Sequence, residues 1–441
     1  MSQLDFKVPS LGECEIDSPL SHAEFVDEDN RISYFLKHRD IESCLEQGLP
    51  LPTFEPAGPR RRIFHDPART RAAIVSCGGL CPGINDVIRS LVNTLWHRYR
   101  VGTIYGIRYG YRGLVAKYGL PPLHLDPDVV DYIHEHGGSI LGSSRGQQSN
   151  EEILATISRM KINLLFTIGG DGTQRATSEI AGLARERNLP LSVIGIPKTI
   201  DNDLNFMDRT FGFESAIYAA GPVISSAHME AKGVHNGIGL VKLMGRESGF
   251  IAASACLANS VANFCLIPEV EFSLDGENGL LPAIKRRLAI KNHAVIVVAE
   301  GAGQGLFEQT GTSRDASGNI VFSDIGLLLK DRIGGYLSRQ RIEHSIKYLD
   351  PSYIIRSVPA YGTDAVYCLH LAENAVHAAM AGKSGMVIAH WHGNFIHVPV
   401  SLAVRERRRI DPKNQLWQSV LGATRQNDYF YARRSEGEGG D

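Results

Sequence analysis

Short apolar runs that end in glycine-rich or polar turns recur through the central part of the chain. Five of these runs cover residues 72–75, 163–168, 191–196, 239–243 and 293–298, and the turns after them read SCGGLCPGIN, GGDGTQRA, PKTIDND, MGRESG and AEGAG. Continuous apolar runs of this length are typical of strands buried on both faces of a parallel sheet. Helical patterns at residues 84–95, 150–161 and 176–187 lie between them. The alternation of strand, loop and helix predicts an α/β fold.

The turns that follow the runs indicate where a ligand binds. In doubly wound sheets, ligands bind at the carboxyl ends of the strands, and all five polar turns lie there. We therefore predict an α/β protein of two doubly wound, Rossmann-like lobes with mainly parallel sheets. The predicted parts are an N-terminal arm at residues 1–68, a first lobe at 69–213 with a returning segment near 357–385, a second lobe at 214–356, and final strands with a C-terminal extension at 386–441.

Composition narrows the class of protein. Of the 441 residues, 43% are apolar and 21% charged, which excludes wholesale disorder, and 46 basic residues against 48 acidic ones leave no strong field for nucleic acid or a membrane. No apolar stretch reaches the roughly 18–20 residues of a membrane span, and no signal peptide is visible. Seven cysteines do not form the pattern of a disulfide framework. We expect a cytoplasmic protein without nucleic-acid or membrane partners.

The turn at Gly169–Thr173 combines glycines with one carboxylate. Glycines let backbone amides approach phosphate oxygens, and Asp171 beside them is the kind of oxygen ligand that Mg²⁺ prefers. The glycine-rich turn at Ser76–Gly83 opens a helix, which also suits an anion. The structural alternative for the first motif is a tight strand-to-helix turn capped by Asp171 or Thr173.

The stretch PKTIDND at residues 197–203 is more informative. In an extended segment, Thr199, Asp201 and Asp203 share one face, where a carboxylate beside a phosphate site can accept a proton from an attacking hydroxyl. The alternative is a turn rich in Asn and Asp.

Cations follow several of the apolar runs. Arg145, Arg246 and Arg356 carry guanidinium groups that suit phosphate, so together they favour a polyanionic ligand, although each alone is explained by a surface salt bridge. The basic run at residues 405–409 is interpreted as a solvated helix face, and the alternative is a patch that binds an anion or a partner. Cys77 with Cys81, and His390 with His392, lack the further ligands of a zinc site and are interpreted as structural.

The chain resembles the 6-phosphofructokinase family over roughly residues 70–400. The motifs that carry the resemblance occur in the family's order: SCGGLCPGIN, GGSILGSSRG, GGDGT, PKTIDND, MGRESG, IPEVEF, AEGAG and YIIR. PKTIDND, KLMGR and the long arm and tail resemble the longer-chain ATP-dependent branch. The resemblance implies transfer of the γ-phosphoryl group of ATP to the C1 hydroxyl of fructose 6-phosphate in glycolysis, with Mg²⁺, by a homotetramer. It also implies that the first lobe binds ATP and the second binds the sugar phosphate.

The resemblance assigns roles to single residues. Asp201 matches the catalytic base, Thr199 orients the phosphoryl group, Arg145 and Arg246 stabilise the transferring group, and Asp171 holds Mg²⁺. The implied nucleotide contacts are Gly78, Gly79, Tyr111 on the adenine side, Arg145, Gly146, Gly170, Asp171, Gly172, Thr173 and Lys198. The implied fructose 6-phosphate contacts are Thr199, Ile200, Asp201, Met244, Gly245, Arg246, Glu300, Lys347, Tyr353, Ile354, Ile355 and Arg356.

The sequence departs from the short bacterial members at three aligned positions. Gly237 replaces an arginine that reaches the neighbouring subunit's substrate, while Asn93 and Asn263 replace an arginine and a glutamate of the effector site. Of the three effector positions, only Arg89 is kept. We therefore expect that the effector site of those enzymes is lost.

Three alternatives to an ATP-dependent 6-phosphofructokinase are a pyrophosphate-dependent relative, an inactive sensor and a kinase for another substrate. Pyrophosphate-dependent relatives have an aspartate at the position of Gly172, where it would repel the α-phosphate of ATP, but they share the lysine found here as Lys198. Gly172 favours ATP over pyrophosphate. A catalytically dead sugar-phosphate or nucleotide sensor would be expected to lose Asp201 or Asp171, and both are present. A lipid or dinucleotide kinase would share GGDGT but not TIDND and MGR.

Overall fold

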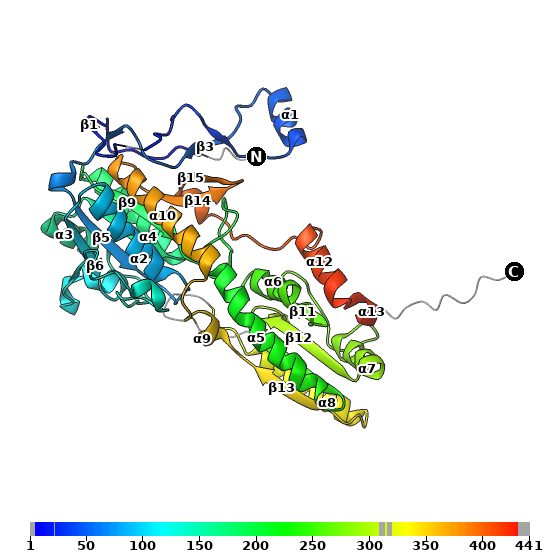
Figure 1. Cartoon of the computed structure of the whole chain (residues 1–441). Coiled ribbons are helices and arrows are strands. Elements are labelled where there is room, and N and C mark those ends of the chain that lie inside the picture. Colours follow the sequence, from blue (N-terminus) through cyan, green and yellow to red (C-terminus); the bar gives the residue numbers. More distant parts are fainter. Residues whose placement is uncertain (1–4, 22, 308–313, 315–319, 431–441) are drawn as a thin grey trace.

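The molecule has two α/β lobes, and the N-terminal arm before β5 (Arg71–Ser76) packs against the larger one (Figure 1). The computed structural model describes residues 5–21, 23–307, 314 and 320–430. Among these residues, no helix is both long enough and apolar enough to span a bilayer. The lobes are built on a nine-stranded and a four-stranded sheet, so the prediction of an α/β fold with two doubly wound lobes is confirmed.

The larger sheet contains strands from the first half of the chain and from both of its ends. Its order is β2-β3-β15-β14-β9-β8-β5-β6-β7, and the central strands β6, β5, β8, β9 and β14 are parallel. The strands are β2 (Ile32–Ser33), β3 (Thr53–Pro56), β5 (Arg71–Ser76), β6 (Thr103–Ile107), β7 (Leu123–His124), β8 (Leu164–Gly169), β9 (Ser192–Pro197), β14 (Met386–Trp391) and β15 (Asn394–Pro399). A separate pair joins β1 (Ile16–Asp17) to β4 (Arg62–Ile63).

Alternating side chains of the central strands enter two cores on opposite faces of the larger sheet. Ile74 and Phe166 pack with α2 and α10, whereas Ala73 and Leu165 pack with α3 and α4. Burial on both faces explains the continuous apolar runs. The helices of the chain are α1 (His38–Glu46), α2 (Ile84–Asn93), α3 (Asn150–Met160), α4 (Asp171–Glu186), α5 (Phe213–Lys232), α6 (Phe250–Asn259), α7 (Leu280–Lys291), α8 (Ile325–Arg339), α9 (Ser352–Ile355), α10 (Gly362–Met380), α11 (Val400–Ala403), α12 (Gln415–Thr424) and α13 (Asn427–Phe430).

The smaller sheet is entirely parallel and has the order β11-β12-β10-β13. Its strands are β11 (Phe264–Leu266), β12 (His293–Ala299), β10 (Gly237–Leu243) and β13 (Ser345–Leu349). Val241 and Val297 face α5 and α6, and Leu240 and Ile296 face α7 and α8. The long helix α5 connects the two lobes (Figure 1).

The arm is part of the larger sheet, because β3 pairs antiparallel with β15. Phe6 and Phe54 of the arm pack edge to face, with ring centroids 4.8 Å apart. Glu55 is the charged anchor: it lies 3.0 Å from the Lys383 ammonium and 3.2 Å from Nδ1 of His397. The arm thus docks through backbone, aromatic and charged contacts together.

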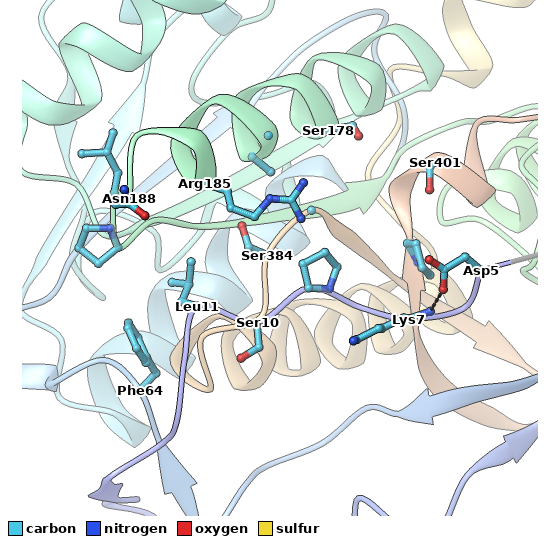
Figure 2. A pocket seen from close by; sticks show the side chains of 17 residues that line it. Asp5, Lys7, Ser10, Leu11, Phe64, Ser178, Arg185, Asn188, Ser384 and Ser401 are labelled. Atoms are coloured by element: carbon cyan, nitrogen blue, oxygen red, sulfur yellow. Dashed lines mark hydrogen bonds between the residues drawn. The ribbon is translucent and has the colours of Figure 1, made fainter.

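A cavity of about 510 Å³ lies beneath the arm (Figure 2). Arm residues Lys7 and Ser10 face Ser178 and Arg185 of α4 across it. Pro190 and Gly385, just before β9 and β14, also line it, so the cavity is at the amino ends of these strands.

The interpretation of residues 405–409 as a solvated helix face is wrong. Helix α11 ends at Ala403, and Arg407 then forms a β-bridge with Leu204. Arg408 donates to the carbonyl oxygens of Met207 and Asp208, which lie 200 or more residues earlier in the chain. A local run of arginines cannot reveal partners at such a distance in sequence.

Candidate active site

The predicted functional turns lie at the carboxyl ends of strands in both lobes. β5, β8 and β9 of the larger sheet end at Ser76, Gly169 and Pro197, and β10 and β12 of the smaller sheet end at Leu243 and Ala299. Parallel strands direct these turns to one edge of each sheet, as the sequence predicts.

Three cations surround the glycine turn after β5. Lys198 donates from Nζ to the carbonyl oxygen of Gly79 at 2.7 Å. A Cβ atom placed on Gly79 would lie 3.7 Å from guanidinium nitrogens of both Arg145 and Arg356. Burial lowers the pKa of Lys198; the Cys81 and Cys77 side chains oppose this shift, and Arg145 and Arg356 add to it. Three cations that converge on a half-buried glycine turn are suited to a polyphosphate.

The GGDGT turn is the start of α4. Gly170 is the residue before the helix, and Asp171, Gly172 and Thr173 form its first turn, where backbone N–H groups have no partner within the helix. A Cβ atom on Gly172 would meet no atom within 4 Å, so the space in front of this turn is open. Asp171 pairs with Arg175 at 3.2 Å on the same helix.

Tyr111 lies below this turn. Its side chain is 7% exposed, and its hydroxyl donates to the carbonyl oxygen of Thr173 at 3.3 Å. In this position Tyr111 supports the first turn of α4.

The segment after β9 contains a turn, so the prediction of an extended segment at Thr199–Asp203 is wrong. Residues 200 and 201 form the turn, and Asn202 has a left-handed φ of 55°. The Asn202 side chain accepts from the backbone N–H of Thr210 at 3.0 Å and stabilises this conformation. The alternative of a turn rich in Asn and Asp describes the backbone, but the turn still brings Thr199 and the carboxylates together.

The two aspartates of the turn have different surroundings. Asp203 accepts from the Thr199 hydroxyl at 2.6 Å and pairs with Arg407 at 3.1 Å. The Oδ1 atom of Asp201 is buried without a hydrogen-bond partner among the described residues. Burial raises the pKa of Asp201 well above its usual range, Asp203 and Glu300 raise it further, and Arg407 and Arg246 oppose them.

The second lobe contributes the loops after β10 and β12. Gly301 donates from its backbone N–H to the carbonyl oxygen of Gly245 at 2.9 Å, and a Cβ atom on Gly301 would lie 1.7 Å from the carbonyl oxygen of Arg246. Only glycine allows this close approach, which holds Glu300 beside the Met244–Arg246 loop. Ser248 links that loop to the first lobe by donating to the carbonyl oxygen of Asp201 at 3.4 Å.

The other predicted sugar-phosphate residues are divided between two places. Tyr353 and Ile354 on α9 are 74% and 62% exposed, and the Arg356 guanidinium lies 4.5 Å from the centre of the Tyr353 ring. Lys347 is on the edge strand β13, where it pairs with Gly239 of β10. Gly239 lies four residues before the carboxyl end of β10, so Lys347 is set back from the loop that follows this strand. No contact links Lys347 to the other site residues among the described part of the chain.

The three departures from the short bacterial pattern are at structural positions. Gly237 begins β10, and a Cβ atom there would lie 2.2 Å from the carbonyl oxygen of Ala231. Asn263 is 9% exposed, and its side chain accepts from the N–H of Val295 at 2.9 Å. Asn93 is the last residue of α2.

Arg407 is the residue near the site that sequence reasoning missed. Its ion pair with Asp203 depends on the C-terminal extension lying across the turn after β9. The sequence gives only one signal for it, a cluster of arginines after the final strands.

Comparison with known proteins identifies the family. The family model described as Phosphofructokinase matches residues 71–379. The ATP-dependent 6-phosphofructokinase of Borreliella burgdorferi is 48% identical over 96% of this chain and 97% of its own length. The protein of the same name from Amycolatopsis methanolica is 48% identical over 97% of this chain and 96% of its own length.

Solved structures agree at the level of the fold. The pyrophosphate-dependent phosphofructokinase of Marinobacter aquaeolei has a TM-score of 0.66 and 21% identity, over 80% of this chain and 91% of that chain. The motifs, the two-lobe architecture and the full-length relatives agree, and this chain belongs to the phosphofructokinase family.

Proposed function

We propose that the protein is an ATP-dependent 6-phosphofructokinase, which transfers the γ-phosphoryl group of ATP to the C1 hydroxyl of fructose 6-phosphate. One observation carries the proposal. The turn after β9 holds the carboxylate of Asp201, whose Oδ1 atom is buried without a partner among the described residues. Ser248 links this turn to the loop after β10. Three cations, Lys198, Arg145 and Arg356, surround the half-buried glycine turn that follows β5 of the same sheet. An acceptor hydroxyl and a polyphosphate donor therefore each have a suitable partner.

Asp201 acts as the general base. Burial and neighbouring carboxylates raise the pKa of Asp201 from its usual acidic range towards neutrality. A general base accepts a proton most effectively in the transition state when its pKa lies near the operating pH. Asp201 takes the proton of the C1 hydroxyl while the sugar oxygen forms its bond to the γ-phosphorus. The bond from that phosphorus to the bridging oxygen of the β-phosphate breaks, and ADP leaves with the electron pair.

The other predicted residues bind and orient the reactants. The nucleotide phosphates are bound by backbone or hydroxyl groups of Gly78, Gly79, Gly146, Gly170, Gly172 and Thr173. Lys198 adds positive charge, and Tyr111 stabilises the first turn of α4 through its hydrogen bond to the carbonyl oxygen of Thr173. Arg145 and Arg246 stabilise the negative charge of the transferring group, and Thr199 orients it. Fructose 6-phosphate is held by Ile200, Met244, Gly245, Glu300, Lys347, Tyr353, Ile354, Ile355 and Arg356.

Asp171 fits a role as the protein ligand of Mg²⁺. Among the described residues no three acidic, histidine or cysteine side chains gather as a metal cage, and nucleotide-bound Mg²⁺ needs only one or two carboxylates besides phosphate and water. Asp171 provides one carboxylate at the open start of α4. When bound there, Mg²⁺ would neutralise charge on the β- and γ-phosphates.

The open space at Gly172 supports ATP as the donor. An aspartate there would put a negative charge where an α-phosphate has to lie, and pyrophosphate has no such group. The full-length relatives named ATP-dependent support the same choice.

A coupled assay tests the function directly. Fructose 6-phosphate is supplied with Mg²⁺ and either ATP or pyrophosphate, and the formation of fructose 1,6-bisphosphate is followed. We expect activity with ATP and little with pyrophosphate. Higher activity with pyrophosphate would overturn the donor assignment, and no product with either donor would overturn the function.

Assembly and location are part of the proposal. A homotetramer is supported by exposed apolar side chains on neighbouring helices, such as Tyr218 of α5 and Val366 of α10, which are 64% and 56% exposed. A cytoplasmic location is supported by the seven cysteines, all of which have free thiols. Light scattering on the purified protein measures the assembly, and a monomer would contradict it.

A further inference from the structure

We propose that Arg407, supplied by the C-terminal extension, is a positioning residue for the catalytic base. It holds Asp203 so that Asp201 is the carboxylate left to accept the proton. This inference rests on the proposed function, because it concerns which of two neighbouring carboxylates accepts the proton in that reaction.

The contacts of Asp203 explain why it is not the proton acceptor. Its Oδ1 atom accepts from the Thr199 hydroxyl at 2.6 Å, and its Oδ2 atom accepts from Arg407 at 3.1 Å. Both oxygens of Asp203 are therefore engaged, and its side chain is only 8% exposed. Asp201, two residues earlier, keeps one buried oxygen without a partner among the described residues.

The same contacts orient Thr199. Its hydroxyl donates to Asp203 and accepts from the backbone N–H of Asp201 at 3.2 Å. Arg407, Asp203, Thr199 and Asp201 thus form a continuous chain of contacts from the C-terminal extension to the base. If Arg407 is lost, Asp203 can rotate, and Thr199 loses the acceptor that fixes its hydroxyl.

The extension is anchored well enough to fix the position of Arg407. The backbone N–H of Arg408 donates to the carbonyl oxygen of Asp203 at 2.8 Å, beside the β-bridge between Arg407 and Leu204. The Arg408 guanidinium donates to the carbonyl oxygens of Met207 and Asp208 and lies 4.8 Å from the centre of the Phe250 ring. Arg407 is therefore presented by a fixed backbone.

The charges around Asp201 predict a signature in the pH dependence. Asp203 and Glu300 face it as anions, and Arg407 and Arg246 face it as cations. Because Arg407 opposes the rise in the pKa of Asp201, its removal would raise that pKa further. Because Asp203 contributes to the rise, its neutralisation would lower the pKa of Asp201. The two changes should shift the acidic limb of the kcat profile in opposite directions.

The experiment compares three variants of the full-length enzyme with the unmodified protein. Arg407→Gln removes its ion pairs with Asp203 and, at 3.9 Å, with Glu247, whereas Arg407→Lys keeps the charge. Arg409→Gln is the matched control, because Arg409 is on the same segment and also pairs with Glu247, at 3.3 Å, but has no ion pair with Asp203 among the described residues. The readouts are kcat, KM for fructose 6-phosphate, the pH profile of kcat and the thermal midpoint.

For Arg407→Gln we expect kcat to fall roughly ten- to a hundredfold, the effect of a misplaced catalytic group, with little change in KM. The acidic limb should shift to higher pH, whereas Arg407→Lys should keep the limb in place and recover part of the rate. A profile of Arg407→Gln that matches Arg409→Gln would overturn the inference. Absence of activity in the unmodified protein would instead contradict the proposed function.

If Arg407→Gln does not fold, Asp203→Asn decides the question, because it has nearly the same shape as the original side chain. A fall in kcat with the acidic limb shifted to lower pH would support the inference. An unchanged limb would overturn it.

Discussion

Two aspartates in one turn have different chemistry because their side chains have different neighbours. Asp203 is engaged by Thr199 and Arg407, whereas Asp201 has a buried oxygen with no partner among the described residues. A sequence pattern can indicate that carboxylates gather here. Residue spacing alone cannot distinguish them, because their different contacts include residue 407, and only the family resemblance assigns the base to Asp201.

Asp201→Asn tests the base. The substitution keeps the shape and removes the proton acceptor, so kcat should fall by ~10²–10⁴-fold with little change in fructose 6-phosphate binding. Burying an ionised carboxylate is unfavourable, so the thermal midpoint should rise in the same variant. Steady-state kinetics and thermal unfolding measure the two effects. Near-normal kcat would contradict the role of Asp201.

Gly172→Asp tests the donor side. The added side chain enters open space, so the fold should be kept, but its charge repels the α-phosphate of ATP. We expect ATP activity to be lost and weak activity with pyrophosphate to become possible. Gly182→Asp on the same helix α4 is the control, since a Cβ atom there also meets nothing within 4 Å. An unchanged KM for ATP in Gly172→Asp would argue against the assignment of this turn.

At the scale of elements, the strands were predicted well and the start of α4 was not. The buried strands β5, β8, β9, β10 and β12 lie within one or two residues of the predicted runs. The sequence predicts a helix from residue 176, yet α4 begins at Asp171, because glycines hide the helical pattern. Gln174 stabilises this first turn, donating from its side-chain amide to the carbonyl oxygens of Gly169 and Ile196 at 2.9 and 3.2 Å. The part of the helix that the sequence pattern misses is the part with open space in front of it, at Gly172.

The strands of the arm were also missed, since β2 and β3 are two and four residues long and lie among prolines. β2 pairs only with β3, and the other partner of β3 is β15, more than 300 residues away, about which local periodicity contains no information.

Glu55→Gln tests how firmly the arm is held. The Lys383 ammonium, on a side chain 11% exposed, would lose its carboxylate partner. Breaking a buried ion pair from one side costs up to about 3–5 kcal/mol of folding free energy, so the thermal midpoint should fall clearly. Glu46→Gln on the exposed helix α1 is the control and should change the midpoint little. Equal midpoints for the two variants would show that this ion pair does not stabilise the arm.

At the scale of the whole molecule, three buried histidines couple stability to pH. Burial lowers the pKa of His65 and His397 to about 4 and that of His377 to about 3. In the unfolded chain each titrates near 6.5. The folded protein therefore binds fewer protons than the unfolded chain in this range, so stability is complete above pH ~6.5 and decreases as the pH falls towards 4.

We expect the thermal midpoint to fall steadily between pH 6.5 and 5, at up to ~1.4 kcal/mol of stability per pH unit for each histidine. His397→Gln should reduce this slope, whereas a substitution of the exposed His392 should not. A midpoint that is constant from pH 7 to 5 would contradict this explanation.

The order of the larger sheet also restricts how the protein is made. Strand β15 lies between β3 of the arm and β14, and β14 joins β9, so β2 and β3 of the arm are connected to the rest of the sheet only through β15 and β14. Until translation has passed Pro399, β3 has no partner on one side and β9 presents an open edge. The larger sheet therefore remains incomplete until β14 and β15 have been made. A message truncated before the codon for Met386 would yield a product with exposed sheet edges, a substrate for chaperones and proteases rather than an enzyme with a smaller tail.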